Sequence, residues 1–376
     1  MAFFLATLLY PYVCSSFAVP LPGQPQDAAQ AARDRLVSES LIRLKDVDIS
    51  GNLKLEGSVF RHALTIRGQN NYFLLARKFR IADLDSDLFQ LATTKPNTTE
   101  GVRAAQVLSD SGQLSRFLKA TSSPDTPVAV GAVAVLGQLD DPSIVPALIR
   151  LVPDKAVPRA VRAGATYSLG KTLSGQRQLL ALVENSMLPE DLEVSAANVL
   201  LGSADEGIRG KAAEYLSLPA SADATPLPPI STLLKMKGDS TRGEIIFKMA
   251  GTCIKCHLVN GKGKAVGPDL SEIGGKLARE AMIVSILDPS AGISHNYETH
   301  NIILNSGNVI SGILVTKTPD SITIKTIEAI EKTFAIGDID EMVKSNVSLM
   351  PTDLQKALTA NDLVDLLDYL ATLKKR

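Results

Sequence analysis

Apolar residues recur at three- and four-residue spacing from about Leu36 to Leu216, which predicts a long succession of short helices. Within this stretch a unit repeats. Three Ala-rich segments each end near a Leu-Gly pair, at Leu136-Gly137, Leu169-Gly170 and Leu201-Gly202, with a period of about 32 residues. A second helix follows in each unit. Helix pairs with small residues on one face pack closely when they are stacked side by side.

These units resemble HEAT-like repeats, a family defined by its pattern of helices rather than by fixed residues. The resemblance implies an α-solenoid over residues 31–218. The polar, Pro-rich residues 219–230 are typical of a linker, which indicates that a second domain covers residues 231–376.

The second domain has a different pattern. A helix is expected to begin at Asp239 or Ser240, another stops at Pro289, and a last helix begins near Thr359. Between the second and last helices, residues 297–337 alternate apolar and polar positions, which predicts an insert of three or four antiparallel strands.

Composition narrows the classes of function. The chain of 376 residues has 39 Lys and Arg against 40 Asp and Glu, and it has no Trp. This balance does not support a nucleic-acid-binding protein. Residues 1–18 are apolar and uncharged, with Ser16 and Ala18 suited to a signal-peptidase site. We therefore expect a signal peptide, a periplasmic or otherwise extracytoplasmic location, and no membrane span in the mature chain.

The stretch AGTCIKCHLVNGKGKAVGPDL contains Cys253 and Cys256, with His257 directly after the second thiol. The third cysteine, Cys14, lies in the expected signal peptide. Two cysteines at this spacing do not make a disulfide framework, so they indicate a site. A zinc site, a redox thiol pair and a haem attachment site all remain possible from the cysteines alone.

Cys-x-x-Cys-His is the attachment motif of c-type haem, because two thiols at this spacing can add to the two vinyl groups and the histidine then ligates the iron. Cys253 and Cys256 would form the thioethers, and His257 would be the proximal ligand. A carbonyl near Pro268 could accept the imidazole Nδ1–H. Met350, in a loop before the last helix, is the candidate sixth ligand.

Other arrangements compete with this one. His295 and His300 have the spacing of a zinc-binding histidine pair and could complete a site with the two cysteines. Either histidine could instead replace Met350 on the iron. A thioredoxin-like thiol pair would need a βαβ setting, which the surrounding pattern does not provide.

The order of a helix, the attachment motif, a Met loop and a C-terminal helix resembles a class I cytochrome c domain. More narrowly, the chain from about Gly238 to Lys375 resembles the haem-binding domain found in planctomycetes and verrucomicrobia, which often follows HEAT-like repeats. The resemblance implies one covalent haem c and one-electron transfer rather than bond-making catalysis. It also implies a redox protein partner, such as a sugar or alcohol dehydrogenase, with the chain as electron carrier or electron-accepting subunit.

The sequence therefore predicts a mainly α protein in which a HEAT-like α-solenoid precedes an all-α cytochrome c domain with a small antiparallel β insert. The zinc-stabilised interaction module remains the alternative.

Overall fold

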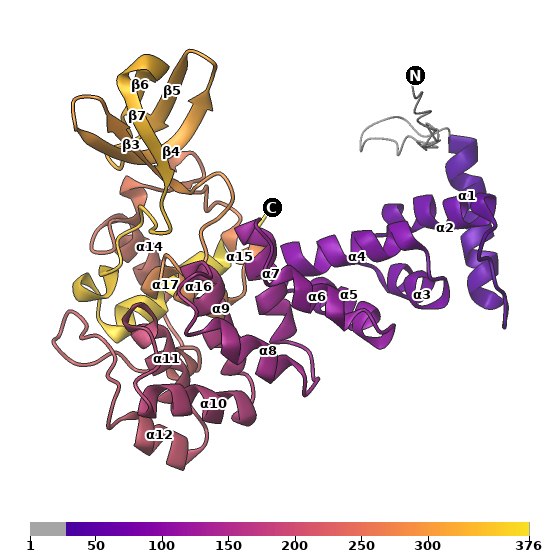
Figure 1. Ribbon diagram of the computed structural model, residues 1–376, viewed down its shortest axis with the longest axis horizontal. Coiled ribbons are helices and arrows are strands. Elements are labelled where there is room, and N and C mark those ends of the chain that lie inside the picture. The colour runs from indigo at the N-terminus through magenta and orange to yellow at the C-terminus, as the bar shows by residue number, and fades with distance from the viewer. Residues whose placement is uncertain (1–27, 376) are drawn as a thin grey trace, which may run out of the picture.

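The computed structural model describes residues 28–375. The expected signal peptide, with Cys14, lies outside these residues. Helices form an elongated repeat region, and a C-terminal region of helices and one larger sheet follows it (Figure 1). The helix α1 lies at one end of the long axis, and the C-terminal sheet lies toward the other end.

The repeat region is built from short helices joined by tight turns. In chain order these are α1 (Ala28–Arg43), α2 (Leu53–Thr65), α3 (Asn70–Lys78), α4 (Ala82–Thr94), α5 (Thr99–Asp110), α6 (Leu114–Ala120), α7 (Thr126–Leu136), α8 (Ile144–Leu151), α9 (Arg159–Leu169), α10 (Leu173–Glu184), the 3₁₀ turn η1 (Glu190–Leu192), α11 (Glu193–Leu200) and α12 (Glu206–Ala212). The helices α7, α9 and α11 end within one residue of the Leu-Gly pairs seen in the sequence.

The glycines after these three helices determine how closely successive units stack. A Cβ atom added to any of them would lie 2.6 to 2.9 Å from a side chain of the next unit, so only hydrogen fits there. The pairs in contact are Gly137 with Ser168, Gly170 with Val199, and Gly202 with Ser231. Ser231 already belongs to the C-terminal region, so the stacking contact continues across the boundary.

The predicted linker packs closely instead of forming a free tether. Ala220 and Pro226 form a β-bridge, and the backbone N–H of Ala222 donates to the Leu358 carbonyl at 3.1 Å. Leu227 is buried in the C-terminal core. The joining segment is therefore hydrogen-bonded to the C-terminal region and anchored there by Leu227, although most of its other residues are exposed.

The helices of the C-terminal region surround one apolar core. They are α13 (Ile230–Leu233), α14 (Ser240–Lys248), η2 (Cys253–Lys255), α15 (Ile273–Lys276), α16 (Arg279–Leu287), η4 (Leu354–Ala357) and α17 (Ala360–Thr372). The predicted starts of α14 and α17 are confirmed, because Asp239 caps α14 and Thr359 forms a capping box with Asp362 at α17.

The helices α14 and α17 cross in close contact. A Cβ on Gly243 would overlap the Asp365 carbonyl oxygen and would lie 2.7 Å from the Tyr369 Cβ. One turn later the rings of Phe247 and Tyr369 pack with their centroids 5.7 Å apart. This crossing joins the helix before the cysteine motif to the helix after Met350.

The sheet is larger than the predicted insert. It has five antiparallel strands, β3 (Thr299–Leu304), β4 (Val309–Lys317), β5 (Ser321–Lys325), β6 (Glu331–Ala335) and β7 (Ile339–Lys344), in the order β6-β5-β4-β3-β7. The prediction of three or four strands ending near residue 337 was therefore wrong. The last strand was missed because β7 is charged, mostly exposed and lacks a clear alternation.

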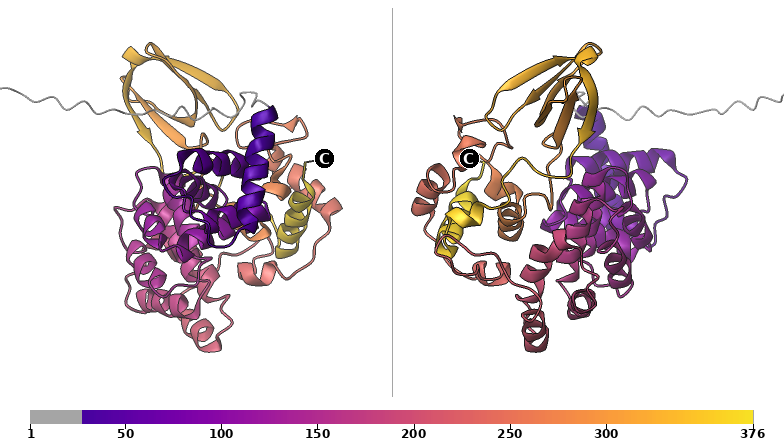
Figure 2. Two further views of the ribbon diagram at one scale, coloured as in Figure 1. Left: turned by 90° about the vertical axis from the view of Figure 1, so that its right-hand side faces the viewer. Right: turned by 60° about the vertical axis from the view of Figure 1, so that its left-hand side comes forward.

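The sheet forms its own small core and stands apart from the helices in both views of Figure 2. Ile302, Ile322 and Ile324 are the buried residues of this core. The C-terminal region is thus a mixture of helices and antiparallel sheet rather than an all-α domain. Among residues 28–375, no helix has the length and apolar character needed to cross a membrane.

The Gly243 contact generates a stability prediction. Gly243→Ala should destabilise the protein by about 1–3 kcal/mol, because the new methyl group meets rigid backbone of α17. Gly275→Ala is the matched control in α15, where an added Cβ has no neighbour within 4 Å. Chemical denaturation of both variants tests this contact, and equal midpoints would contradict it.

Candidate functional site

A sharp turn after α14 positions the cysteine motif. The N–H of Gly251 donates to the Ile246 carbonyl at 2.8 Å and ends the helix. Thr252 then adopts a left-handed conformation, with φ at 51°, and starts the 3₁₀ turn η2. A Cβ on Gly251 would lie 3.2 Å from the Cys253 Sγ, so the glycine leaves room beside this thiol.

Backbone hydrogen bonds fix the spacing of the two cysteines. The N–H groups of Cys256 and His257 both donate to the Cys253 carbonyl, at 3.0 and 2.9 Å. Cys253 begins the 3₁₀ turn η2, and Cys256 directly follows its last residue, so the two thiols lie at the two ends of one turn. Both cysteines are free thiols.

His257 is oriented by a loop carbonyl. Its Nδ1 lies 2.8 Å from the carbonyl oxygen of Pro268, the residue expected from the sequence to provide this contact. Because a carbonyl only accepts, Nδ1 carries the hydrogen and Nε2 keeps its lone pair. Burial lowers the pKa of His257, which also favours the neutral ring that can ligate a metal.

Glycine is required beside the imidazole. A Cβ on Gly267 would lie 2.5 Å from the His257 Cε1, so the loop backbone passes directly against the ring. The N–H groups of Val266 and Gly267 both donate to the Cys256 carbonyl, at 3.0 and 2.8 Å. Hydrogen bonds thus hold the loop that contains Gly267 against the cysteine motif. Nothing in the sequence distinguishes Gly267, although it directly precedes Pro268.

A short hairpin begins the same loop. The strands β1 (Leu258–Val259) and β2 (Lys262–Gly263) pair with each other. Gly263 has φ at 116°, which favours glycine, and the hairpin returns the chain toward the cysteines.

Met350 shares a core with the cysteine motif. Its side chain is half-buried and packs against the C-terminal core, against which Cys253 and Ile254 also pack. Its N–H donates to the Ser348 Oγ at 3.1 Å. The structure thus brings the loop of Met350 to the core that holds the motif, although many residues separate them in the chain.

The alternative histidines are placed differently. The side chain of His295 is 75% exposed, and its Nδ1 lies 3.8 Å from a Glu298 carboxylate oxygen. His300 lies in β3 with its Nδ1 3.1 Å from the Glu298 carbonyl. Within residues 28–375, no three His, Cys, Asp or Glu side chains are grouped to hold a metal ion. The zinc set suggested by the sequence is therefore not assembled.

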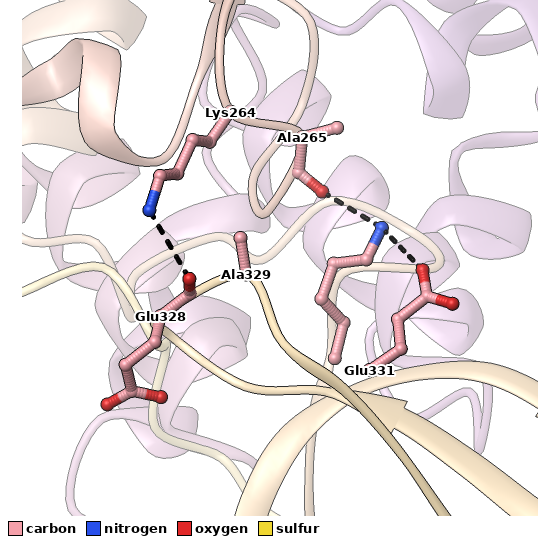
Figure 3. A pocket seen from close by; sticks show the side chains of 6 residues that line it. Lys264, Ala265, Glu328, Ala329 and Glu331 are labelled. Carbon is pink, nitrogen blue, oxygen red and sulfur yellow. Dashed lines mark hydrogen bonds and ion pairs between the residues drawn. The ribbon is translucent and has the colours of Figure 1, made fainter.

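The sheet contacts the histidine loop, which the sequence did not reveal. The Lys325 amine of β5 donates to the Ala265 carbonyl at 3.2 Å and pairs with Glu331 at 3.1 Å, beside an open cavity of about 530 Å³ (Figure 3). The Lys264 amine reaches the Glu328 carbonyl at 3.4 Å. A sequence shows no signal for such contacts, because they depend on how the sheet folds back.

The two thiols differ in reactivity. Burial raises the pKa of the Cys253 thiol to about 11, and it raises the pKa of the Cys256 thiol less strongly because that residue is less buried. Only the thiolate reacts with alkylating reagents. Iodoacetamide at pH 8 should therefore label Cys256 before Cys253 in the folded, haem-free chain, and the rate at Cys253 should keep rising with pH.

Peptide mass spectrometry of the time course measures both rates. In urea the two thiols should react alike, since burial is lost. Faster labelling of Cys253 than of Cys256 in the folded chain would contradict the burial that the structure assigns.

Comparison with known proteins adds one finding. The family described as HEAT repeats matches residues 114–199, which run from α6 almost to the end of α11. No curated protein matches the chain. HEAT-like repeats are therefore present in the helical region that precedes the cysteine motif.

Proposed function

We propose that this protein transfers single electrons through one haem c bound covalently to Cys253 and Cys256. The observation that carries the proposal is the hydrogen bond between His257 Nδ1 and the Pro268 carbonyl. It leaves Nε2 available as a ligand on the residue that directly follows the second of two free thiols. Bound haem would supply an iron that cycles between two oxidation states.

The residues present fit this group. Gly251 leaves space beside one thiol, and Gly267 lets the loop backbone support the imidazole ring. The partly buried His257, whose pKa is lowered, is suited as a neutral ring to ligate iron. Both cysteines are free and belong to the same turn.

Met350 is the proposed sixth ligand. It packs on the same core as the motif, whereas His295 points into solvent. A thioether together with an imidazole stabilises reduced iron and favours a higher potential. With both axial positions filled by the protein, electron transfer is favoured over oxygen chemistry.

The proposed partner is a redox protein such as a dehydrogenase. Stacked repeats offer an extended surface that suits protein binding. The exposed Lys255, Lys262 and Lys264 surround the cysteine motif and would attract an acidic surface. Covalent haem attachment in bacteria takes place outside the cytoplasm, so we propose an extracytoplasmic location.

Expression together with haem-attachment machinery tests the proposal. The purified protein should show reduced haem bands that survive denaturation and acid–acetone extraction, because thioether bonds do not dissociate. The double variant Cys253→Ala/Cys256→Ala should lose its haem under the same treatment. Bound zinc without iron in elemental analysis would overturn the proposal in favour of a zinc-stabilised module.

Met350 can be tested separately. Met350→Ala should abolish the Met-to-iron charge-transfer band of the oxidised protein, while haem stays covalently attached. Met249→Ala is the matched control, since Met249 lies near the motif at the end of α14 but is 70% exposed. A band that persists in Met350→Ala would identify a different sixth ligand.

A further inference from the structure

The loop that carries Met350 is hydrogen-bonded to a segment that follows α16. The N–H of Ser348 donates to the Ser290 Oγ at 3.1 Å, and the N–H of Met350 donates to the Ser348 Oγ at 3.1 Å. Ser290 is only 4% exposed. Two successive hydroxyl groups thus connect Met350 to this buried position.

The same segment is anchored in the repeat region. The Asp288 carboxylate, 5% exposed, accepts two bonds from the Arg159 guanidinium of α9, at 2.7 and 3.1 Å. It accepts a third from the Ser195 Oγ of α11, at 2.9 Å. Ala291 packs within the core of the repeats. The segment from Asp288 to Ala291 belongs to the C-terminal region, but both of its ends are therefore anchored in the repeat region.

The ion pair between Arg159 and Asp288 has the geometry of a strong interaction. A guanidinium and a carboxylate that meet through two parallel bonds, away from water, fix both position and orientation. The second ion pair across this boundary, between Lys171 and Glu280, is 32% and 47% exposed and is weaker for that reason. The Arg159 pair is the one connected to the Met350 loop.

At the start of this loop the Ser345 N–H donates to the Thr299 carbonyl at 2.8 Å, and the Val347 N–H donates to the Ser345 Oγ at 3.1 Å. Asn346 and Val347 are exposed, and they line a cavity of about 530 Å³ together with Arg159, Asp288 and Ser290. Side-chain packing is therefore sparse on this side of the loop. The hydrogen bonds through Ser290 and Ser348 connect the loop to the segment that follows α16.

We propose that Arg159, Asp288 and Ser290 are positioning residues for Met350, so that the repeat region holds the sixth ligand in place. This inference rests on the proposed function, in which Met350 ligates the iron. The repeats then have a role inside the molecule, in addition to any partner that they bind.

Displacement of Met350 by imidazole in the oxidised, haem-loaded protein tests the proposal. Loosening the loop should raise the apparent affinity for imidazole about tenfold, the effect of losing one hydrogen bond of ordinary strength. We expect this increase in Ser290→Ala, which keeps the size of the side chain. We also expect it in Arg159→Ala/Asp288→Asn, which leaves no buried charge unpaired.

Two controls disturb the same boundary without touching the loop. Lys171→Ala removes the exposed ion pair, and Ser231→Ala removes a hydroxyl that donates to the Gly202 carbonyl at 3.1 Å. Both should bind imidazole like the unchanged protein. An equal increase in the controls, or none in Ser290→Ala, would overturn the positioning role.

Hydrogen exchange in the haem-free chain gives a readout that does not depend on haem. The amides of Ser348 and Met350 should exchange about tenfold faster in Ser290→Ala than in Ser231→Ala. Equal rates would refute the restraint. If the restraint is present but the charge-transfer band is absent from the unchanged protein, the assignment of Met350 fails and the restraint stands.

Discussion

The crossing of α14 and α17 is the contact on which the candidate site depends. Gly243 allows the two backbones to touch, and the buried Asp365 of α17 accepts the Asp239 N–H at 2.7 Å and the Arg242 Nε–H at 2.8 Å. These bonds fix the direction in which α14 delivers the cysteine motif. Because α17 directly follows the Met350 loop, one crossing brings both parts of the site to the same core.

The repeat region and the C-terminal region share buried packing contacts and hydrogen bonds. The glycine contact that stacks one unit on the next recurs at the boundary, where Gly202 meets Ser231. Tyr167 packs against both cores, and Asp288 is buried between Arg159 and Ser195. The repeat region is therefore connected to the Met350 loop through buried contacts.

The sequence anticipated the local features well. The Leu-Gly pairs and the caps at Asp239 and Thr359 depend on residues a few positions apart, so their patterns are visible in one dimension. The prediction was weaker where strands are short and charged, which is why β7 was missed. The histidine pair His295 and His300 looked like metal ligands by spacing, but spacing does not bring side chains together.

The sequence by itself determined the chemistry that is available: two thiols, an imidazole and a thioether in a fixed order, with helices at each end. Only the tertiary structure decided which groups meet. It placed the backbone of Gly267 against the His257 ring, and it selected Arg159 as the partner of Asp288. Such contacts join residues far apart in the chain, and they form only when packing of the whole core brings those residues together.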